Sequence, residues 1–132
     1  MTTAAPPSSA RRPELLRSLI PKFACLAVAL GVTYVFFIQY CDLIFSCGCQ
    51  ALWAGASSSC NIHAPAPPHC PWCLHHGSYG WWSLSGICAA QAGIALWPGA
   101  FGLARGISVF LAFPVLGGVF GVAAGLVTGY WG

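Results

Sequence analysis

The sequence predicts an all-α integral membrane protein with three transmembrane helices and a Cys/His-rich extramembrane loop between the first and second helices. Apolar residues make up 58% of the chain and charged residues only 5%, against roughly 25% charged residues in an ordinary globular domain. Three long stretches carry no charge at all. The five basic residues are confined to the region before the first stretch and the turn between the last two. The 132 residues leave room for one domain.

The first membrane helix is expected over residues 19–40. Residues 23–40 carry no charge, and about 20 residues cross a hydrocarbon core of about 30 Å. Asp42 marks the far end of this helix. The preceding residues 1–18 are polar and rich in proline and serine, which predicts a mobile cytoplasmic tail. A cleaved secretory signal is disfavoured because the apolar run exceeds the ~7–15 residues of such a segment.

The second and third membrane helices are expected over 80–102 and 106–131. Both segments are uncharged and of spanning length. Tryptophans lie near both ends of the second segment, and Tyr130 and Trp131 close the third. Aromatic residues at such positions are typical anchors at the membrane–water interface.

The distribution of basic residues predicts the orientation. Four of the five flank the start of the first helix, and Arg105 lies in the turn between the second and third. The loop at 41–79 contains neither Lys nor Arg. The positive-inside rule therefore places the amino terminus and the Arg105 turn in the cytoplasm, and the loop and the carboxyl terminus in the periplasm. A bacterial inner membrane is the expected location.

The loop at 41–79 concentrates the sulfur and imidazole groups of the chain. Six of the eight cysteines and all four histidines lie within 41–76. Three kinds of chemistry are open for this cluster. The first is disulfide bonding, because six cysteines in an oxidising compartment could close three bridges. Each bridge would offset the ordering entropy of the loop by about 2–4 kcal/mol.

The second kind of chemistry is metal binding. The sequences Cys60-x-x-His63 and Cys70-x-x-Cys73 each place two donors on a tight turn, as in structural zinc sites. We therefore expect these four residues to bind one tetrahedral ion. Zinc suits the mixture of thiolate and imidazole best, whereas copper carriers in oxidising spaces use methionine, and the chain has only Met1. The alternate ligands are Cys47, Cys49, His69, His75 and His76.

The third kind of chemistry is thiol–disulfide exchange. Residues 70–73 read CPWC, a Cys-x-x-Cys motif, and His69 stands beside it to lower a thiol pKa. Cys47 and Cys49 would form the second pair that passes electrons on. The alternative function is therefore a periplasm-facing membrane thiol–disulfide oxidoreductase or a metal-handling protein that uses the CPWC pair.

Glycines recur every four residues in the third helix, at Gly117, Gly121, Gly125 and Gly129. Residues four apart share one helix face, and a face of small residues lets another helix approach closely in lipid. Two interpretations are open. The face packs on another helix of the same chain, or it docks onto a separate subunit or a second copy.

The uncharged spans exclude several functions. Ionisable residues inside a membrane mark proton paths, ion sites and cofactor ligation, so their absence disfavours a pump, a channel or a haem protein. Gln91 is expected to make an interhelical hydrogen bond. The basic residues form no patch for nucleic acid. We expect a small accessory subunit of a larger membrane complex, not an enzyme, which contacts the lipid bilayer and other subunits through the glycine face and the external loop.

Overall fold

The computed structural model describes residues 8–132, without the side chains of 8–15 and 75–77. Within this part the chain forms three long helices and no strand: α1 (Ser8–Phe45), α2 (Leu74–Leu96) and α3 (Leu103–Thr128). The segment between α1 and α2 contains two short 3₁₀ turns, η1 (Leu52–Ala54) and η2 (Asn61–His63). The predicted all-helical fold is confirmed for the described residues.

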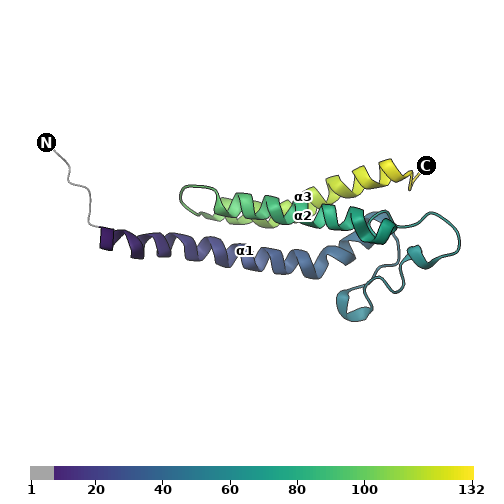
Figure 1. The fold of residues 1–132 in the computed structure, drawn as a ribbon, viewed down its shortest axis with the longest axis horizontal. Helices are drawn as coiled ribbons and strands as arrows, with labels where there is room; N and C mark the ends of the chain where they lie inside the picture. Colours follow the sequence, from purple (N-terminus) through teal and green to yellow (C-terminus); the bar gives the residue numbers. More distant parts are fainter. Residues whose placement is uncertain (1–7) are drawn as a thin grey trace.

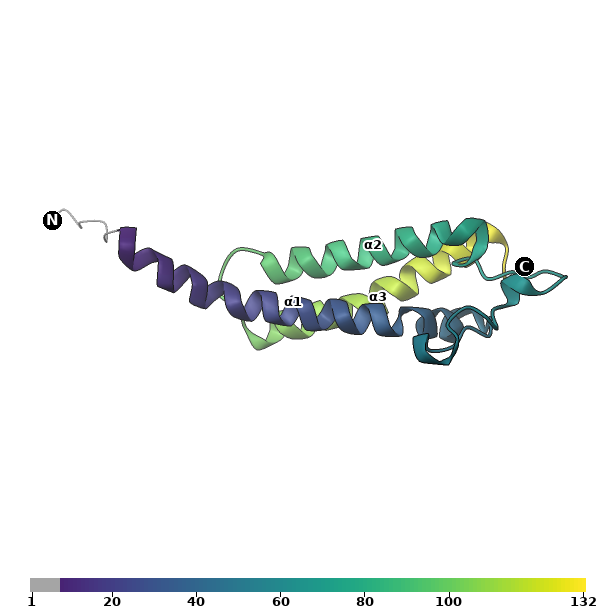
Figure 2. The same ribbon diagram turned by 60° about the horizontal axis from the view of Figure 1, so that its bottom comes forward.

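The three helices lie side by side in an elongated bundle (Figures 1 and 2). The segment that joins α1 to α2 gathers at the end of the bundle where α1 ends, α2 begins and α3 ends. Among the described residues, α1 from Leu16 onward and α3 are long and apolar enough to cross a membrane. Helix α2 has the length but is less apolar, so a third span is not established.

The helix boundaries differ from the sequence-based expectations. Helix α1 starts at Ser8, so residues 8–18, expected as a tail, are helical. Arg, Glu and Leu in this stretch are good helix formers; residues 1–7 lie outside the described part. At the other end α1 continues through Asp42 to Phe45. The Asp42 carboxylate accepts a hydrogen bond from the Gly48 backbone N–H at 2.7 Å, so this residue stabilises the turn after the helix.

Gln91 links all three helices. Its side chain is fully buried on α2. The Nε2 group donates to the Thr33 hydroxyl on α1 at 2.9 Å and to the Val109 carbonyl oxygen on α3 at 3.2 Å. The Thr33 hydroxyl in turn donates to Gln91 Oε1 at 3.1 Å. The predicted interhelical hydrogen bond of Gln91 is confirmed, and it fixes the rotation of the helices about their axes.

The glycine face of α3 is covered by α1 within the same chain. A Cβ atom added at Gly117 would lie 2.7 Å from the Tyr40 ring, and one added at Gly121 would lie 2.6 Å from Ile44 Cδ1. Both glycines are buried. Small residues here let α1 and α3 approach closely, as expected for helix packing in lipid. The structure therefore shows that this face packs against α1 of the same chain. Docking of another subunit on it remains a prediction.

Gly129 ends α3 instead of extending its glycine face. It adopts the left-handed conformation, with φ 66°, which glycine enters at no steric cost. Its N–H donates to the Leu126 carbonyl oxygen at 3.3 Å, and the Tyr130 N–H donates to the Gly125 carbonyl oxygen at 2.9 Å. This pair of bonds is a Schellman motif. The chain reverses there, and the Trp131 ring packs against Gly125.

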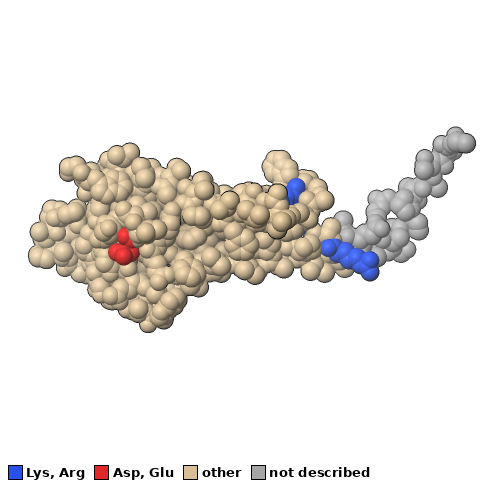
Figure 3. All heavy atoms as spheres, turned by 180° about the vertical axis from the view of Figure 1, so that it is seen from behind, with Lys and Arg blue, Asp and Glu red and all other residues tan. Residues whose placement is uncertain are grey.

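The described basic side chains gather at one end of the bundle, while the described acidic side chain lies in the other part (Figure 3). Lys22 Nζ and Arg105 Nη1 each donate to the Trp97 carbonyl oxygen at 3.0 Å. This carbonyl directly follows α2, where the helix dipole favours cations. The amino-terminal part of α1 and the α2–α3 turn are thereby held together at the end remote from the cysteines.

Candidate metal centre

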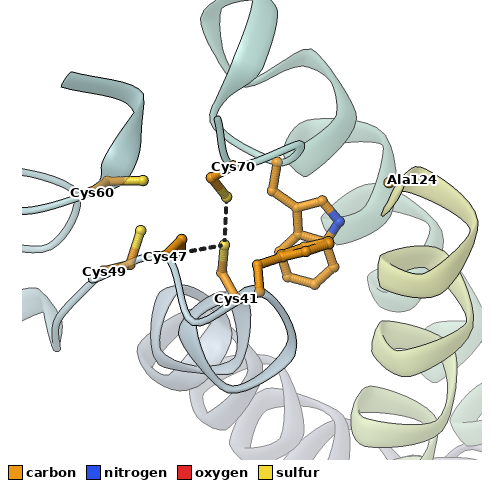
Figure 4. Packing of buried hydrophobic residues seen from close by; sticks show 8 residues of the cluster. Cys41, Cys47, Cys49, Cys60, Cys70 and Ala124 are labelled. Atoms are coloured by element: carbon orange, nitrogen blue, oxygen red, sulfur yellow. Dashed lines mark hydrogen bonds between the residues drawn. The ribbon is translucent and has the colours of Figure 1, made fainter. Parts of the chain in front are cut away.

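Six cysteines collect at the end of the bundle opposite the basic residues. The last turns of α1 supply one, the turn after α1 supplies two, a third segment before η2 supplies one, and the CPWC turn before α2 supplies two. Figure 4 labels five of them, and their side chains point toward a common space. The six are Cys41, Cys47, Cys49, Cys60, Cys70 and Cys73.

The sulfur atoms of these cysteines form four trios in which all Sγ atoms lie within 4.8 Å of one another. Individual separations include 3.1 Å for Cys41–Cys70, 3.6 Å for Cys60–Cys73 and 4.0 Å for Cys49–Cys73. Three sulfurs that share one ion at about 2.3 Å lie about 4.0 Å apart, so this spacing suits a metal ion. The trios are Cys41–Cys47–Cys49, Cys41–Cys70–Cys73, Cys47–Cys60–Cys70 and Cys49–Cys60–Cys73.

The cysteines are free thiols, not disulfides. The sulfurs of Cys41 and Cys70 are 3.1 Å apart, well beyond the ~2.05 Å of a disulfide bond. No pair of these sulfurs lies at bonding distance, so the structure does not show the disulfides that were one of the three open interpretations, and the cluster presents thiols that are able to bind a metal. Cys25 and Cys88 stand apart as half-buried residues within α1 and α2.

Aromatic side chains wall the cluster. Five of its six cysteines are buried, and Cys73 is half-buried. The Trp72 ring, 3% exposed, stacks on Phe37 with ring centroids 4.5 Å apart and an interplanar angle of 4°. Phe45 meets Trp72 edge-on at 5.9 Å and Tyr130 edge-on at 5.2 Å. A metal ion held here would be shielded from water on this side.

The thiols influence one another's protonation. The hydrogen bond from Cys41, followed by those from Cys47 and Cys49, lowers the pKa of Cys70 to about 4. Burial instead raises the pKa of Cys60 to about 12. Lys22 and Arg105 are bound at the other end of the bundle and cannot balance thiolate charge here. A bound cation would supply that balance, because metal ions bind cysteine as the thiolate.

Asn61 fastens the cysteine-bearing segments together. Its backbone N–H donates to the Cys47 carbonyl oxygen at 2.7 Å, and its Oδ1 accepts from the Cys70 backbone N–H at 2.7 Å. Its Nδ2 donates to the Pro68 carbonyl oxygen at 2.9 Å and to the Tyr130 hydroxyl at 3.1 Å. The backbone and the side chain of this one residue therefore together set the relative positions of the CGC and CPWC turns.

The structure brings together only part of the predicted ligand set. Cys60, Cys70 and Cys73 are in the cluster, whereas His63 belongs to none of the trios. The alternates Cys47 and Cys49 are also in the cluster. The side chains of His75 and His76 lie outside the described residues.

His69 Nδ1 lies 3.0 Å from the Asn61 carbonyl oxygen, so this imidazole makes a structural contact beside the CPWC turn. Sequence reasoning missed Cys41, because Asp42 was taken as the end of the first helix. The six-residue spacing from Cys41 to Cys47 was the available signal, since a turn directly after a helix that ends at Phe45 brings Cys47 back toward Cys41.

A cavity of about 800 Å³ adjoins the cluster. Its lining includes Cys41, Cys49 and Cys73 from the cluster, together with His63 and Trp81. These three sulfurs are pairwise neighbours within the trios. The cavity therefore gives access to one side of the thiol cluster, with an imidazole beside the approach.

The chain was compared with known proteins by sequence and by fold. No protein-family model, no curated protein and no solved structure matches it. The site and the fold therefore supply the basis for a function.

Proposed function

We propose that this chain is a small accessory subunit of a larger membrane protein complex, whose external cap is folded by a metal–thiolate centre. The main observation that supports this proposal is that six cysteine sulfurs from separate segments form trios, in each of which the sulfurs lie within 4.8 Å of one another. A metal in this position joins the end of α1, the turn that follows it and the start of α2. Its role is to hold the loop in one shape for docking.

The donor set favours a soft metal ion. Every group in the trios is a thiol, and thiolates select zinc, Cu(I) and iron–sulfur clusters over hard cations. Zinc in a tetrahedral site needs four donors, and each trio supplies three sulfurs that lie within 4.8 Å of one another. The loop has no carboxylate beyond Asp42, which bonds to Gly48, so magnesium and calcium are poor candidates.

The membrane placement rests on length and charge. Helix α2 has 23 residues, about 34 Å at 1.5 Å per residue, which matches a bilayer core. We therefore propose that α2 crosses together with α1 and α3 in a bacterial inner membrane. Because Lys22 and Arg105 lie at the same end, the positive-inside rule puts this end in the cytoplasm and the thiol cluster in the periplasm.

The external loop and nearby aromatic residues form the proposed contact surface for other subunits. Trp53, Trp81 and Trp82 are 73%, 68% and 79% exposed, and Leu43 is 75% exposed. An uncharged surface of this kind marks an interaction site or the membrane interface. Docking through the glycine face would displace α1 side chains, so we place the principal subunit contacts at the loop.

A thiol–disulfide oxidoreductase remains the alternative proposal. The CPWC pair lies within the cluster, and a buried pair of thiols can cycle between reduced and oxidised forms. However, the attacking thiol of such an enzyme needs to be accessible, and Cys70 is 0% exposed. The metal-binding function therefore accounts better for the site.

Metal and thiol analysis of the full chain tests the proposal. The protein is purified in detergent without oxygen from cells supplied with zinc and copper, and metal per chain is measured beside the accessible thiols. We expect bound metal and few reactive thiols in the native chain, loss of metal in Cys60→Ser and Cys73→Ser, and retention in the matched control Cys88→Ser. A protein that takes up neither zinc nor Cu(I), even on reconstitution, contradicts the proposal.

A further inference from the structure

The four trios share their sulfurs in a regular way. Each of the six cysteines belongs to two trios, and any two trios have one cysteine in common. Six points related in this way are the corners of an octahedron, and the trios are four of its alternate faces. The sulfur pairs that share no trio are the opposite corners: Cys41 and Cys60, Cys47 and Cys73, and Cys49 and Cys70.

This pattern makes the six sulfurs equivalent, because each has four close neighbours. Two zinc ions in tetrahedra that share an edge would need two bridging cysteines and four terminal ones, and each terminal cysteine would have only three neighbours. A single tetrahedral zinc would use four sulfurs and leave two. One ion bound by all six would need octahedral geometry, which is typical of oxygen donors. The two zinc arrangements do not use six equivalent thiolates, and the single six-coordinate ion would need a geometry that thiolate donors do not favour.

An iron–sulfur cluster also fits poorly. In a [4Fe–4S] cluster each cysteine binds a different iron, and in a [2Fe–2S] cluster two cysteines bind each iron, around a core of bridging sulfide, so neither cluster places three protein sulfurs around one ion. The Cys41–Cys70 and Cys41–Cys47 separations of 3.1 and 3.5 Å leave no room for such a core. The ions must therefore sit on the faces of the sulfur octahedron, each bound by three sulfurs directly.

We propose that the six cysteines form one polynuclear Cu(I)–thiolate cluster, with a copper ion in each of the four trios and each thiolate bridging two ions. This inference rests on the proposed function and specifies its metal and nuclearity. Cu(I) suits a trigonal all-sulfur site because it is soft and its filled d shell imposes no higher coordination number. The lack of methionine, which disfavoured a copper carrier, does not weigh against a cluster built from thiolates alone.

Assembly of this cluster involves no redox step. Four Cu(I) ions replace up to six thiol protons, which pass to water, and copper remains Cu(I) throughout. The four positive charges of the Cu(I) ions offset four of the six thiolate charges, so the bound cluster retains two negative charges. Asp42 lies near this end but is bonded to Gly48, and the aromatic wall of Trp72 and Phe45 excludes water.

The cavity identifies the side from which copper enters. It touches Cys41, Cys49 and Cys73, which are pairwise neighbours and so define one face of the octahedron. His63 lines the same cavity without belonging to a trio. An imidazole there is a transfer ligand that receives Cu(I) from the donor molecule and releases it to the thiolates.

Anaerobic Cu(I) titration of the reduced full chain, followed by native mass spectrometry and X-ray absorption, tests the inference. Because every thiolate bridges two ions, binding of one ion positions the ligands of the next. We therefore expect cooperative filling, with the metal-free and four-copper forms dominating at every copper ratio. The absorption spectrum should show three sulfurs per copper and a copper–copper contact. Isolated copper without such a contact, or any other final stoichiometry, overturns the inference.

Matched variants separate this inference from the proposed function. Cys41→Ser removes a bridging sulfur from two trios and should abolish the four-copper form, while Cys88→Ser should keep it. His63→Ala should keep four copper ions and slow their uptake at least severalfold. A chain that binds one or two zinc ions but no copper cluster overturns the cluster and leaves the metal–thiolate function intact. A chain that binds neither metal removes both.

Discussion

Asn61 Nδ2 donates a hydrogen bond to the Tyr130 hydroxyl at 3.1 Å, across 69 positions of sequence. The same hydroxyl donates to the Phe45 carbonyl oxygen at 2.6 Å. Tyr130 therefore binds the end of α1 and the organising side chain of the cysteine loop at once. The residues after α3 are part of the support of the thiol cluster, although none of them is a ligand.

Substitution Asn61→Ala should disorder the cysteine loop. It leaves the Cys70 backbone N–H without its acceptor and removes both Nδ2 bonds, and each unpaired buried group costs about 1–3 kcal/mol. We expect a lower unfolding temperature and weaker metal retention against a competing chelator. Asn61→Asp keeps the acceptor for Cys70 and should be intermediate; equal behaviour of Asn61→Ala and the native chain would refute this role.

Substitution Tyr130→Phe tests the tie between α3 and the loop. The ring still packs edge-on against Phe45, but both bonds of the hydroxyl are lost. The expected loss of stability is about 1–3 kcal/mol, measured by thermal unfolding in detergent with and without metal. Tyr34→Phe is a suitable control because Tyr34 is 66% exposed. A similar loss in both variants would mean that the tie contributes nothing.

Substitution Gly117→Ala tests whether the glycine face of α3 packs against α1 in the same chain or docks onto another subunit. The added Cβ would lie 2.7 Å from the Tyr40 ring, and this ring is held by its hydroxyl bond to the Pro114 carbonyl oxygen at 2.6 Å. Overpacking of this kind costs about 1–3 kcal/mol. Gly118→Ala meets only the Tyr40 hydroxyl at 3.4 Å and should be mild. Unchanged stability of the isolated chain, combined with lost complex assembly, would instead favour docking of a subunit.

Substitution Gln91→Leu should loosen the bundle without affecting the cysteine cluster. It removes the bonds to Thr33 and Val109, and interhelical bonds in membranes contribute about 0.6–2 kcal/mol each. The expected result is easier unfolding in denaturing detergent with an unchanged metal content. Altered metal content at full stability would show that Gln91 acts on the site and not on the packing.

The stability of the metal-free chain should fall at alkaline pH. Burial raises the pKa of Cys60 from an ordinary 9.0 to about 12, so the folded state holds this proton more tightly than the unfolded chain. The resulting stability is fully present below pH 9 and is lost as the pH rises from about 9 to about 12. Unfolding temperatures across this range measure the loss, and Cys60→Ala should reduce its slope, because the pKa values of Cys41 and Cys49 are also raised in the folded chain. The same slope in both chains would rule out Cys60 as its source.

The helical fold was predictable because the chain contains long apolar stretches without charge, and stretches of this length and composition favour helices. Gln91 was also predictable, since a lone amide in an apolar helix needs a partner. The boundaries were not, because Ser8 to Ser18 is helical without apolar periodicity. Gly129 fits the four-residue glycine spacing in the sequence, and only the backbone shows that it ends the helix.

The ligand set was predictable only in part. The spacing of pairs such as Cys70 and Cys73 identifies them in the sequence. Cys41 could not be identified in this way, because it lies near the end of α1, which extends further than expected. His63 has the right spacing from Cys60 but lines the cavity instead. Local spacing shows which side chains share a turn, and the meeting of separate turns depends on contacts such as those of Asn61.

The reversal at Gly129 sets an order of events during biosynthesis. Because Tyr130 follows α3, its bonds to Phe45 and Asn61 form only after the ribosome has synthesised all three helices. Cys41, on the helix made first, waits until then for its neighbours. Under the proposed function, metal delivery therefore follows the synthesis of α3, and a chain stalled within α3 would present bare thiols to oxidants and proteases.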